Sequence, residues 1–159
     1  MKKNKIQLLL FSLLLIFIGF LREYLFVSIN LRIQQIYYNS NENVNLIPDW
    51  IQYISHLNYS ELLILKWVLT FIFIVAFWLV AILIFKKFSF DKKDIKLFSI
   101  VLVTLLIASL LFYWIGDSLF NKEYFGYKIA RSITGFLQSP LPILIYIAFV
   151  YSIKKQSKH

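Results

Sequence analysis

Residues 67–85, with the sequence WVLTFIFIVAFWLVAILIF, form a stretch of 19 positions that contains no charged side chain. Residues 97–115, LFSIVLVTLLIASLLFYWI, repeat this pattern over another 19 positions. At about 1.5 Å per residue, a helix of roughly 20 residues crosses the ~30 Å of hydrocarbon in a bilayer. The two stretches therefore predict membrane-spanning helices, and they indicate an all-α integral membrane protein.

Two further apolar segments complete the predicted set of spans. Residues 6–21 follow a lysine-rich start and lack the small-residue cleavage site of a signal peptide, so we expect a retained first span. Residues 133–153 carry no charge until their end, although Pro140 and Pro142 fall within them. We therefore predict a four-helix bundle in a single membrane domain, residues 1–159. Its spans are predicted at about 6–21, 67–85, 97–115 and 133–153.

The composition agrees with a membrane protein and excludes several functional classes. Of 159 residues, 60% are hydrophobic and 16% are charged, whereas soluble domains carry about 25% charged residues. Because the chain has no cysteine, it cannot form a disulfide, a thiolate metal site or a cysteine nucleophile. Two histidines and four dispersed glycines do not suffice for a histidine-rich metal site or a glycine-rich phosphate loop. We expect no metal, no other cofactor and no enzymatic activity.

The placement of the basic residues predicts the orientation of the spans. Both termini and the connection between the second and third spans contain 11 of the 17 Lys and Arg residues, and the two outer connections contain 6. By the positive-inside rule, both termini face the cytoplasm, as in a multi-pass protein of the cytoplasmic (inner) membrane. The net charge of +9 then lies on the cytoplasmic side, facing anionic lipid headgroups of the bilayer, so it does not indicate nucleic-acid binding.

The first outer connection, residues 22–66, has helical patterning of its own. Apolar residues at helical spacing predict a helix over 24–38, which either continues the first span or bends onto the membrane surface. The run of Asn, Ser and Glu over 39–45 predicts the outermost turn of this connection.

A short helix and a helix cap are predicted before the second span. Proline is favoured at the first position of a helix, so Pro48 predicts a short helix that runs to His56. Asn58 and Glu61 have the spacing of a capping box at the start of the helix that becomes the second span. His56 lacks an obvious catalytic partner, and we expect an interfacial role for it.

Ionisable residues collect where the predicted spans meet the outer boundary. They are Arg22, Glu23, Lys66, Asp117, Lys128 and Arg131. Charges at this depth either reach to the headgroups or pair within the bundle, because exposure to lipid is costly. We expect Lys66 and Lys128 to reach to the headgroups. We expect Arg22, Glu23 and Arg131 to meet at the outer end of the bundle, because pairing lowers the cost of charge near lipid.

The fourth predicted span carries a polar stripe. Its members are Tyr127, Arg131, Thr134 and Gln138. They follow one another at steps of 4, 3 and 4, so they share one face of a helix, which we expect to point inward. Pro140 and Pro142 come directly after the stripe and predict a kink there. The stripe is explained either by packing alone or by a surface offered to a partner's transmembrane helix or a lipid-linked group.

Several short motifs together resemble a known family. They are Arg22-Glu23-Tyr24-Leu25-Phe26-Val27 with Ser28-Ile29-Asn30, then Tyr37-Tyr38, Leu65-Lys66-Trp67, and Tyr127 to Arg131 leading to Gln138-Ser139-Pro140-Leu141-Pro142. The set resembles the small membrane proteins encoded beside exosortases in Bacteroidetes, of the exosortase X or exosortase F associated type. The resemblance implies a non-enzymatic accessory role in protein sorting or surface-polymer assembly, with an exosortase-like membrane transpeptidase as the partner. Exosortases are thought to use a Cys, an Arg and a His, and this chain has no Cys.

Two alternatives stay open at this point. A small four-helix transporter usually needs a carboxylate inside the membrane, and no Asp or Glu falls within the four predicted spans. A membrane enzyme acting on a lipid-linked substrate through Arg131, Arg22 or His56 would need a base and a nucleophile in reach of each other, which no motif indicates. The oligomeric state is left open. We assign partner binding to Arg22, Glu23, Tyr127, Arg131, Thr134, Gln138 and Pro140.

Overall fold

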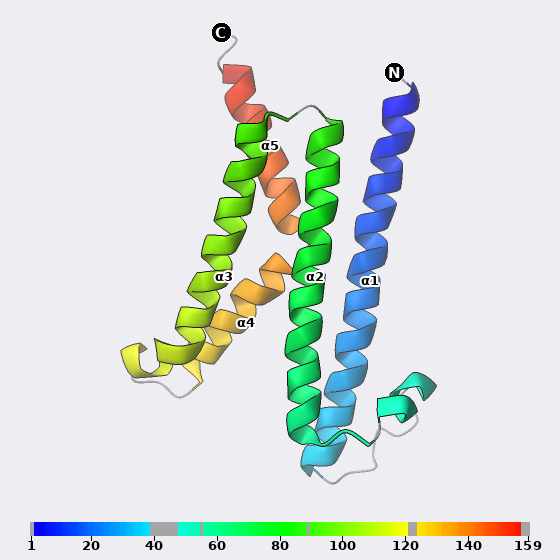
Figure 1. The fold of residues 1–159 in the computed structure, drawn as a ribbon, viewed down its shortest axis with the longest axis vertical. Coiled ribbons are helices and arrows are strands. Elements are labelled where there is room, and N and C mark those ends of the chain that lie inside the picture. Colours follow the sequence, from blue (N-terminus) through cyan, green and yellow to red (C-terminus); the bar gives the residue numbers. More distant parts are fainter. Residues whose placement is uncertain (1, 39–47, 55, 89, 121–123, 157–159) are drawn as a thin grey trace.

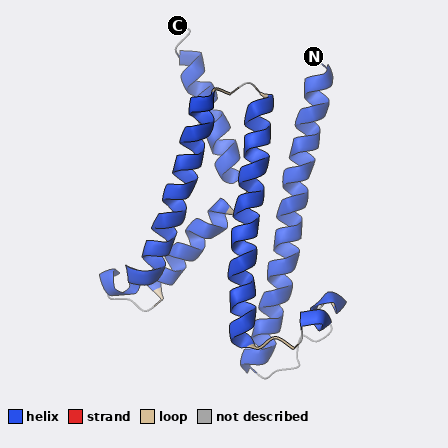
Figure 2. Ribbon diagram, in the orientation of Figure 1, coloured by secondary structure: helices blue, strands red, loops and turns tan. Residues whose placement is uncertain are grey.

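A computed structural model describes residues 2–38, 48–54, 56–88, 90–120 and 124–156, and all regular structure within them is helical (Figure 2). The elements are α1 (Lys2–Tyr38), the 3-10 helix η2 (Asp49–Ile54), α2 (Tyr59–Lys87), α3 (Lys92–Phe120), α4 (Phe125–Leu137) and α5 (Leu141–Gln156). The all-α fold class is therefore as predicted.

Three of these helices are long and apolar enough to cross a membrane. The qualifying segments are Leu9–Tyr38 in α1, Tyr59–Lys87 in α2 and Lys92–Gly116 in α3. α4 and α5 pass the same test together, but they are bent by 66° at the break between them. The described residues thus contain three candidate spans, or four if the bent pair is one broken span. A straight fourth span over 133–153 is not present.

Helix α1 is much longer than the first predicted span. We predicted a span over 6–21, whereas the helix runs without interruption from Lys2 to Tyr38. Of the two alternatives for residues 24–38, continuation of the first helix is the one observed. Its 37 residues correspond to about 55 Å, which exceeds the thickness of the hydrocarbon core. Arg22 and Glu23 therefore lie inside a helix, where their charges do not mark a helix end.

The connection before α2 contains the predicted helix cap and a short helix that differs from the predicted one in length and type. Asn58 Oδ1 accepts a hydrogen bond from the Glu61 amide at 2.9 Å, and Glu61 Oε2 accepts one from the Asn58 amide at 2.8 Å, which confirms the capping box. The predicted helix 48–56 is shorter than expected and is a 3-10 helix, with Pro48 directly before it. The predicted turn over 39–45 lies outside the described residues.

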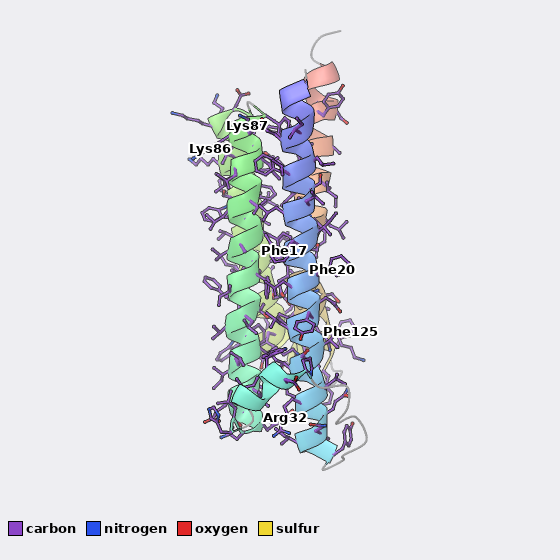
Figure 3. The ribbon with its side chains drawn as sticks, turned by 90° about the vertical axis from the view of Figure 1, so that its right-hand side faces the viewer. Phe17, Phe20, Arg32, Lys86, Lys87 and Phe125 are labelled. Carbon is purple, nitrogen blue, oxygen red and sulfur yellow. The ribbon has the colours of Figure 1, made fainter. Side chains whose placement is uncertain are left out.

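The helices are arranged so that one end of the molecule is basic. Figure 1 shows the start of α1, the end of α5 and the connection between α2 and α3 at the same end. Figure 3 shows Lys86 and Lys87 at this end, here named the basic end, and Arg32 toward the opposite end, here named the far end. This placement agrees with the predicted grouping of both termini with the middle connection. Which side of a membrane the basic end faces stays a prediction.

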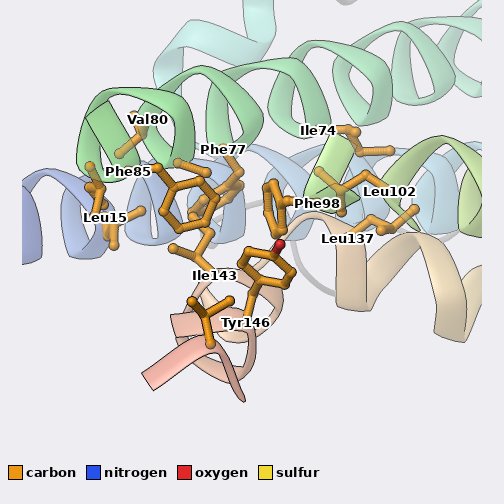
Figure 4. Packing of buried hydrophobic residues seen from close by; sticks show 13 residues of the cluster. Leu15, Ile74, Phe77, Val80, Phe85, Phe98, Leu102, Leu137, Ile143 and Tyr146 are labelled. Atoms are coloured by element: carbon orange, nitrogen blue, oxygen red, sulfur yellow. The ribbon is translucent and has the colours of Figure 1, made fainter. Parts of the chain in front are cut away.

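An aromatic cluster holds α2, α3 and α5 together toward the basic end (Figure 4). The Phe85 ring lies 5.0 Å from the ring of Phe98 and 5.5 Å from the ring of Tyr146, and all three side chains are buried. The hydroxyl of Tyr146 also donates to the Asp94 carbonyl oxygen at 2.6 Å, which links α5 to the start of α3. Aromatic pairs of this kind contribute about 0.5–1.5 kcal/mol each beyond the area they bury.

Small residues bring α3 and α4 into backbone contact. A Cβ atom added at Gly116 would overlap Gly126 Cα and lie 3.3 Å from Gly126 N, so only glycine fits there. Ser109 Oγ donates to the Ala130 carbonyl oxygen at 3.3 Å along the same contact. Gly126 therefore has a packing role, with Gly116 as its partner. Because α4 is fixed against α3, its other side faces α1 and α2.

Candidate functional site

The break between α4 and α5 places Gln138 in the interior of the molecule. The helix ends at Leu137, where the Gln138 amide donates to the Thr134 carbonyl oxygen at 3.0 Å. Ser139 Oγ donates to the Phe136 carbonyl oxygen at 2.7 Å and accepts from the Leu141 amide at 3.3 Å, so one hydroxyl joins both helix ends. The kink predicted from the two prolines is confirmed as a complete break, and the Gln138 side chain is only 3% exposed.

A cavity of about 240 Å³ lies beside this break and is lined by residues of α1, α2, α3 and α4. Figure 1 shows α2 and α3 close together at the basic end and diverging toward the far end, with α4 crossing between them. Gln138, at the end of α4, is one of the residues that line the cavity. Its ionisable lining residues are Arg22, Glu23, Lys66 and Arg131.

Arg22 connects the first helix to the break. Its Nε donates to Gln138 Oε1 at 3.2 Å, and its Nη1 forms an ion pair with Glu23 Oε2 at 3.1 Å. The guanidinium carbon also lies 5.3 Å from the centre of the Phe26 ring, within the range of a cation–π contact. The Arg22 side chain is therefore held by three contacts, which position its charge in the cavity lining beside Gln138.

Lys66 joins α2 to α1 in the same cavity. Its Nζ donates to Asn30 Oδ1 at 2.7 Å, and the side chain is partly buried. The expectation that Lys66 reaches out to the headgroups is therefore wrong, because a neutral acceptor on the facing helix holds its ammonium group. Lys128, which carried the same expectation, is exposed and does not line the cavity.

Arg131 carries the third positive charge of the cavity. Its side chain is exposed, and within the described residues its guanidinium has neither a hydrogen bond nor an ion pair. It lies close enough to Lys66 for their positive charges to repel. Three basic side chains thus share the cavity with one carboxylate, Glu23, which gives the lining a formal charge of +2. The neutral partner Asn30 offsets none of this charge.

An aromatic wall closes the cavity on the side of α3. The Trp67 ring lies 5.4 Å from the Tyr113 ring, and Tyr113 lies 6.4 Å from Tyr127, so the three rings link α2, α3 and α4. Each ring remains between 38% and 45% exposed. Tryptophan and tyrosine with an apolar body and a polar edge are typical of the boundary between hydrocarbon and headgroups. The wall therefore suits a site at that depth.

The predicted polar stripe points into this cavity. Six of the seven residues assigned to partner binding line it, namely Arg22, Glu23, Tyr127, Arg131, Thr134 and Gln138. Thr134 and Gln138 are buried, as the inward orientation requires. The Thr134 hydroxyl is already used, because it donates to the Ala130 carbonyl oxygen at 2.9 Å in its own helix. Pro140 lies beyond the lining, and it contributes through the break alone.

Arg22, Glu23 and Arg131 meet in one cavity, as predicted, although only Arg22 and Glu23 touch. The prediction did not include Lys66 in this cluster of charged residues, and the sequence contains only a weak indication that Lys66 belongs to it. Asn30 faces Lys66 only because α1 continues past residue 21 and runs antiparallel to α2. His56 lies in the connection before α2 and is exposed, away from the cavity lining.

Comparison of the chain with protein-family models, with curated proteins and with solved structures found no match. In the described part of the chain, no group of three His, Cys, Asp or Glu residues could hold a metal ion. The lining of the cavity suits an anion, because guanidinium and ammonium groups donate charge-assisted hydrogen bonds to carboxylate and phosphate oxygens.

Proposed function

We propose that this protein is a non-enzymatic, multi-pass membrane protein that binds an anionic group at the outer boundary of the membrane. The observation that carries the proposal is the convergence of Arg22, Lys66 and Arg131 from three helices on one cavity with a single carboxylate. Placing excess charge at the edge of hydrocarbon is costly. Anion binding would explain why these costly charges are present, whereas packing alone could be achieved with apolar side chains.

The lengths of the helices support this depth. From Lys86 to Lys66, the 20-residue separation along α2 corresponds to about 30 Å, the thickness of the hydrocarbon core. From Lys5 to Arg22, the separation along α1 corresponds to about 26 Å. With the basic end in the cytoplasm, as the positive-inside rule predicts, the cavity lies in the outer part of the bilayer.

The wider role that we propose is that of an accessory component in an exosortase-type sorting or surface-polymer system of the inner membrane. The motifs that resemble this family lie far apart in the sequence, yet Arg22, Lys66, Arg131 and Gln138 from these motifs surround one cavity. In this proposal α4 and α5 together form a fourth, broken span, so that both termini are cytoplasmic. In this role, the protein would hold the anionic group in the membrane next to the transpeptidase that it binds.

Transport is a second candidate because of two observations. Discontinuous helices such as α4 and α5 commonly form the binding sites of transporters. The sequence argument against transport also assumed that the first span ends at residue 21, whereas Glu23 lies inside the candidate span of α1. However, Glu23 is paired with Arg22 and its side chain is 64% exposed, which is unlike an isolated buried proton site.

Glu23→Gln separates the two candidate functions. The substitution should abolish proton-coupled transport, whereas it should strengthen anion binding by removing the negative charge.

The accessory role is tested with Arg131→Leu in cells that carry the sorting system. The variant should insert at normal abundance, because Arg131 has no side-chain partner within the described residues, yet it should lose co-purification with the transpeptidase and surface sorting. The matched control is Lys128→Leu, which removes an exposed basic residue of the same helix from outside the cavity. If the Arg131 variant sorts normally, the accessory role assigned to this cavity is wrong.

A further inference from the structure

We infer that the anionic group recognised by the cavity is a phosphate monoester on a membrane lipid. The inference rests on the proposed anion site and deepens it by naming the ligand class. The lining has three basic groups and one acidic group, which leaves a formal charge of +2. A phosphate monoester carries about −1.5 to −2 charges at pH 7 and therefore neutralises the cavity. A carboxylate, or the phosphodiester of an ordinary glycerophospholipid, carries only one negative charge and leaves part of the excess uncompensated.

The donors that remain available suit the oxygens of a phosphate. Arg131 has five N–H donors and makes no side-chain hydrogen bond within the described residues. Lys66 uses one of its three donors on Asn30 Oδ1. Arg22 donates through Nε and Nη1 to Gln138 and Glu23, which orients its remaining guanidinium nitrogen. A guanidinium fork beside an ammonium group is a favourable arrangement for phosphate recognition.

The cavity also has exposed lining on the sides of α1 and α4. α1 packs along α2 and α4 packs along α3, whereas extensive packing between α1 and α4 is absent from the described residues. Val27 on α1 is 45% exposed, and Tyr127 on α4 is 38% exposed. Glu23 and Arg131 are exposed at the same borders. A ligand can therefore reach the cavity between these two helices from within the membrane.

An apolar track on α1 leads from this opening toward the middle of the membrane. Val27, Phe20, Phe17 and Leu13 follow at steps of 7, 3 and 4, so they share one helix face, and their exposed fractions range from 45% to 73%. Phe17 and Phe20 are labelled on α1 in Figure 3. From an outer-leaflet headgroup, lipid chains extend toward the midplane, which is the direction of this track. The face therefore offers a path for the chains of a lipid whose phosphate lies in the cavity.

The size of the cavity limits what enters it. Its volume of about 240 Å³ is below the roughly 300–1,000 Å³ of sites that enclose drug-sized ligands. The cavity has room for a compact headgroup, while the lipid chains remain outside along α1. The aromatic residues Trp67, Tyr113 and Tyr127 bound the cavity on the side of α3 and limit how far a larger headgroup could extend in that direction.

The test measures lipid binding to the purified full-length protein in detergent by native mass spectrometry. The probes are dioleoyl phosphatidic acid, a phosphate monoester, and dioleoyl phosphatidylglycerol, a phosphodiester with the same chains. We expect phosphatidic acid to bind at least about tenfold more tightly, and Arg131→Gln or Lys66→Gln to reduce its affinity by about tenfold or more. Lys128→Gln should leave the affinity unchanged, because Lys128 does not line the cavity.

Two outcomes would overturn the inference. Equal affinity for the two lipids, or unchanged affinity in Arg131→Gln, would show that the cavity does not select a lipid phosphate. The second is displacement of phosphatidic acid by micromolar inorganic phosphate, which would identify free phosphate as the occupant and reject the lipid. Arg131→Gln keeps the test valid even if Lys66→Gln fails to fold, because within the described residues the Arg131 guanidinium makes no hydrogen bond or ion pair that Gln would break.

The result can be separated from that of the proposed accessory role. If Arg131→Leu abolishes sorting but phosphatidic acid shows no preference, the lipid inference alone is wrong. If phosphatidic acid binds selectively and sorting is unaffected by the same substitution, the accessory role alone is wrong.

Discussion

Arg22 in α1 and Gln138 at the end of α4 are 116 residues apart in the sequence, yet Arg22 Nε donates to Gln138 Oε1 at 3.2 Å. The Gln138 side chain is 3% exposed, so its carbonyl oxygen needs a partner inside the protein. Arg22 provides that partner and is itself oriented by the bond. This contact ties the first helix to the break between the last two, and both residues line the cavity.

Replacing Gln138 should therefore loosen the connection between α1 and α4. In Gln138→Leu, Arg22 loses a hydrogen-bond acceptor, and such a bond to a charged group contributes about 1.5–3 kcal/mol. We expect a lower thermal midpoint in detergent for this variant. The same substitution at the exposed Gln34 of α1 should change stability by no more than about 0.5 kcal/mol. Equal midpoints for the two variants would mean that the Arg22 contact contributes nothing to stability.

The contact between α3 and α4 gives a second prediction. Gly116→Ala introduces a Cβ against the Gly126 backbone, which cannot move aside as a flexible side chain could. We expect a loss of about 1–3 kcal/mol, measured by thermal or denaturant unfolding, because the two helices must separate. Gly19→Ala is the control, since nothing lies within 4 Å of a Cβ added there. A neutral Gly116→Ala would contradict the backbone contact.

The Asn30 and Lys66 pair allows a double-mutant cycle. Asn30→Leu leaves the partly buried Lys66 ammonium group without its acceptor, so it should destabilise the protein by about 1–3 kcal/mol. Adding Lys66→Met should recover part of that loss, because an apolar pair removes the unpaired charge. Unfolding midpoints of the wild type and the three variants give the coupling. Additive effects would show that the two side chains do not interact.

Orientation is predicted from charge and is measured with reporter fusions. A reporter after Gln156 should be active only in its cytoplasmic form, because both termini lie with the lysine-rich connection. A reporter inserted at Asn41 should behave as extracytoplasmic. Cytoplasmic activity at Asn41 would reverse the side of the membrane on which the cavity lies, and an extracytoplasmic C-terminus would mean that α4 and α5 do not form one span.

Local patterns in the sequence predicted much of the secondary structure. The uncharged stretches 67–85 and 97–115 fall within α2 and α3, and the spacing of Asn58 and Glu61 identified the capping box. Helical periodicity also predicted that the polar stripe shares one face, because residues at steps of 3 and 4 lie together. All four residues line the cavity, although only Thr134 and Gln138 are buried. These features depend on neighbours within one or two helical turns, so a single sequence contains the information that they need.

Contacts between helices were harder to predict. The predicted first span, residues 6–21, is too short because Arg22 and Glu23 resemble the charged residues that mark a membrane boundary. No local feature of the sequence shows that Gln138 accepts a hydrogen bond from Arg22. The same limit applies to Lys66, since its partner Asn30 lies 36 residues away. Which residues face each other depends on the register between helices, and apolar side chains of similar size specify that register only weakly.

The most direct test of the cavity as a lipid phosphate site uses the fluorescence of Trp67, which lines it. The difference in quenching between the wild type and Trp67→Phe isolates this residue from the other tryptophans. Phosphatidic acid with brominated chains should quench Trp67 more strongly than phosphatidylglycerol with the same chains, and Arg131→Gln should remove the difference. Equal quenching by the two lipids, unchanged in Arg131→Gln, would contradict the assignment of the cavity as a phosphate site.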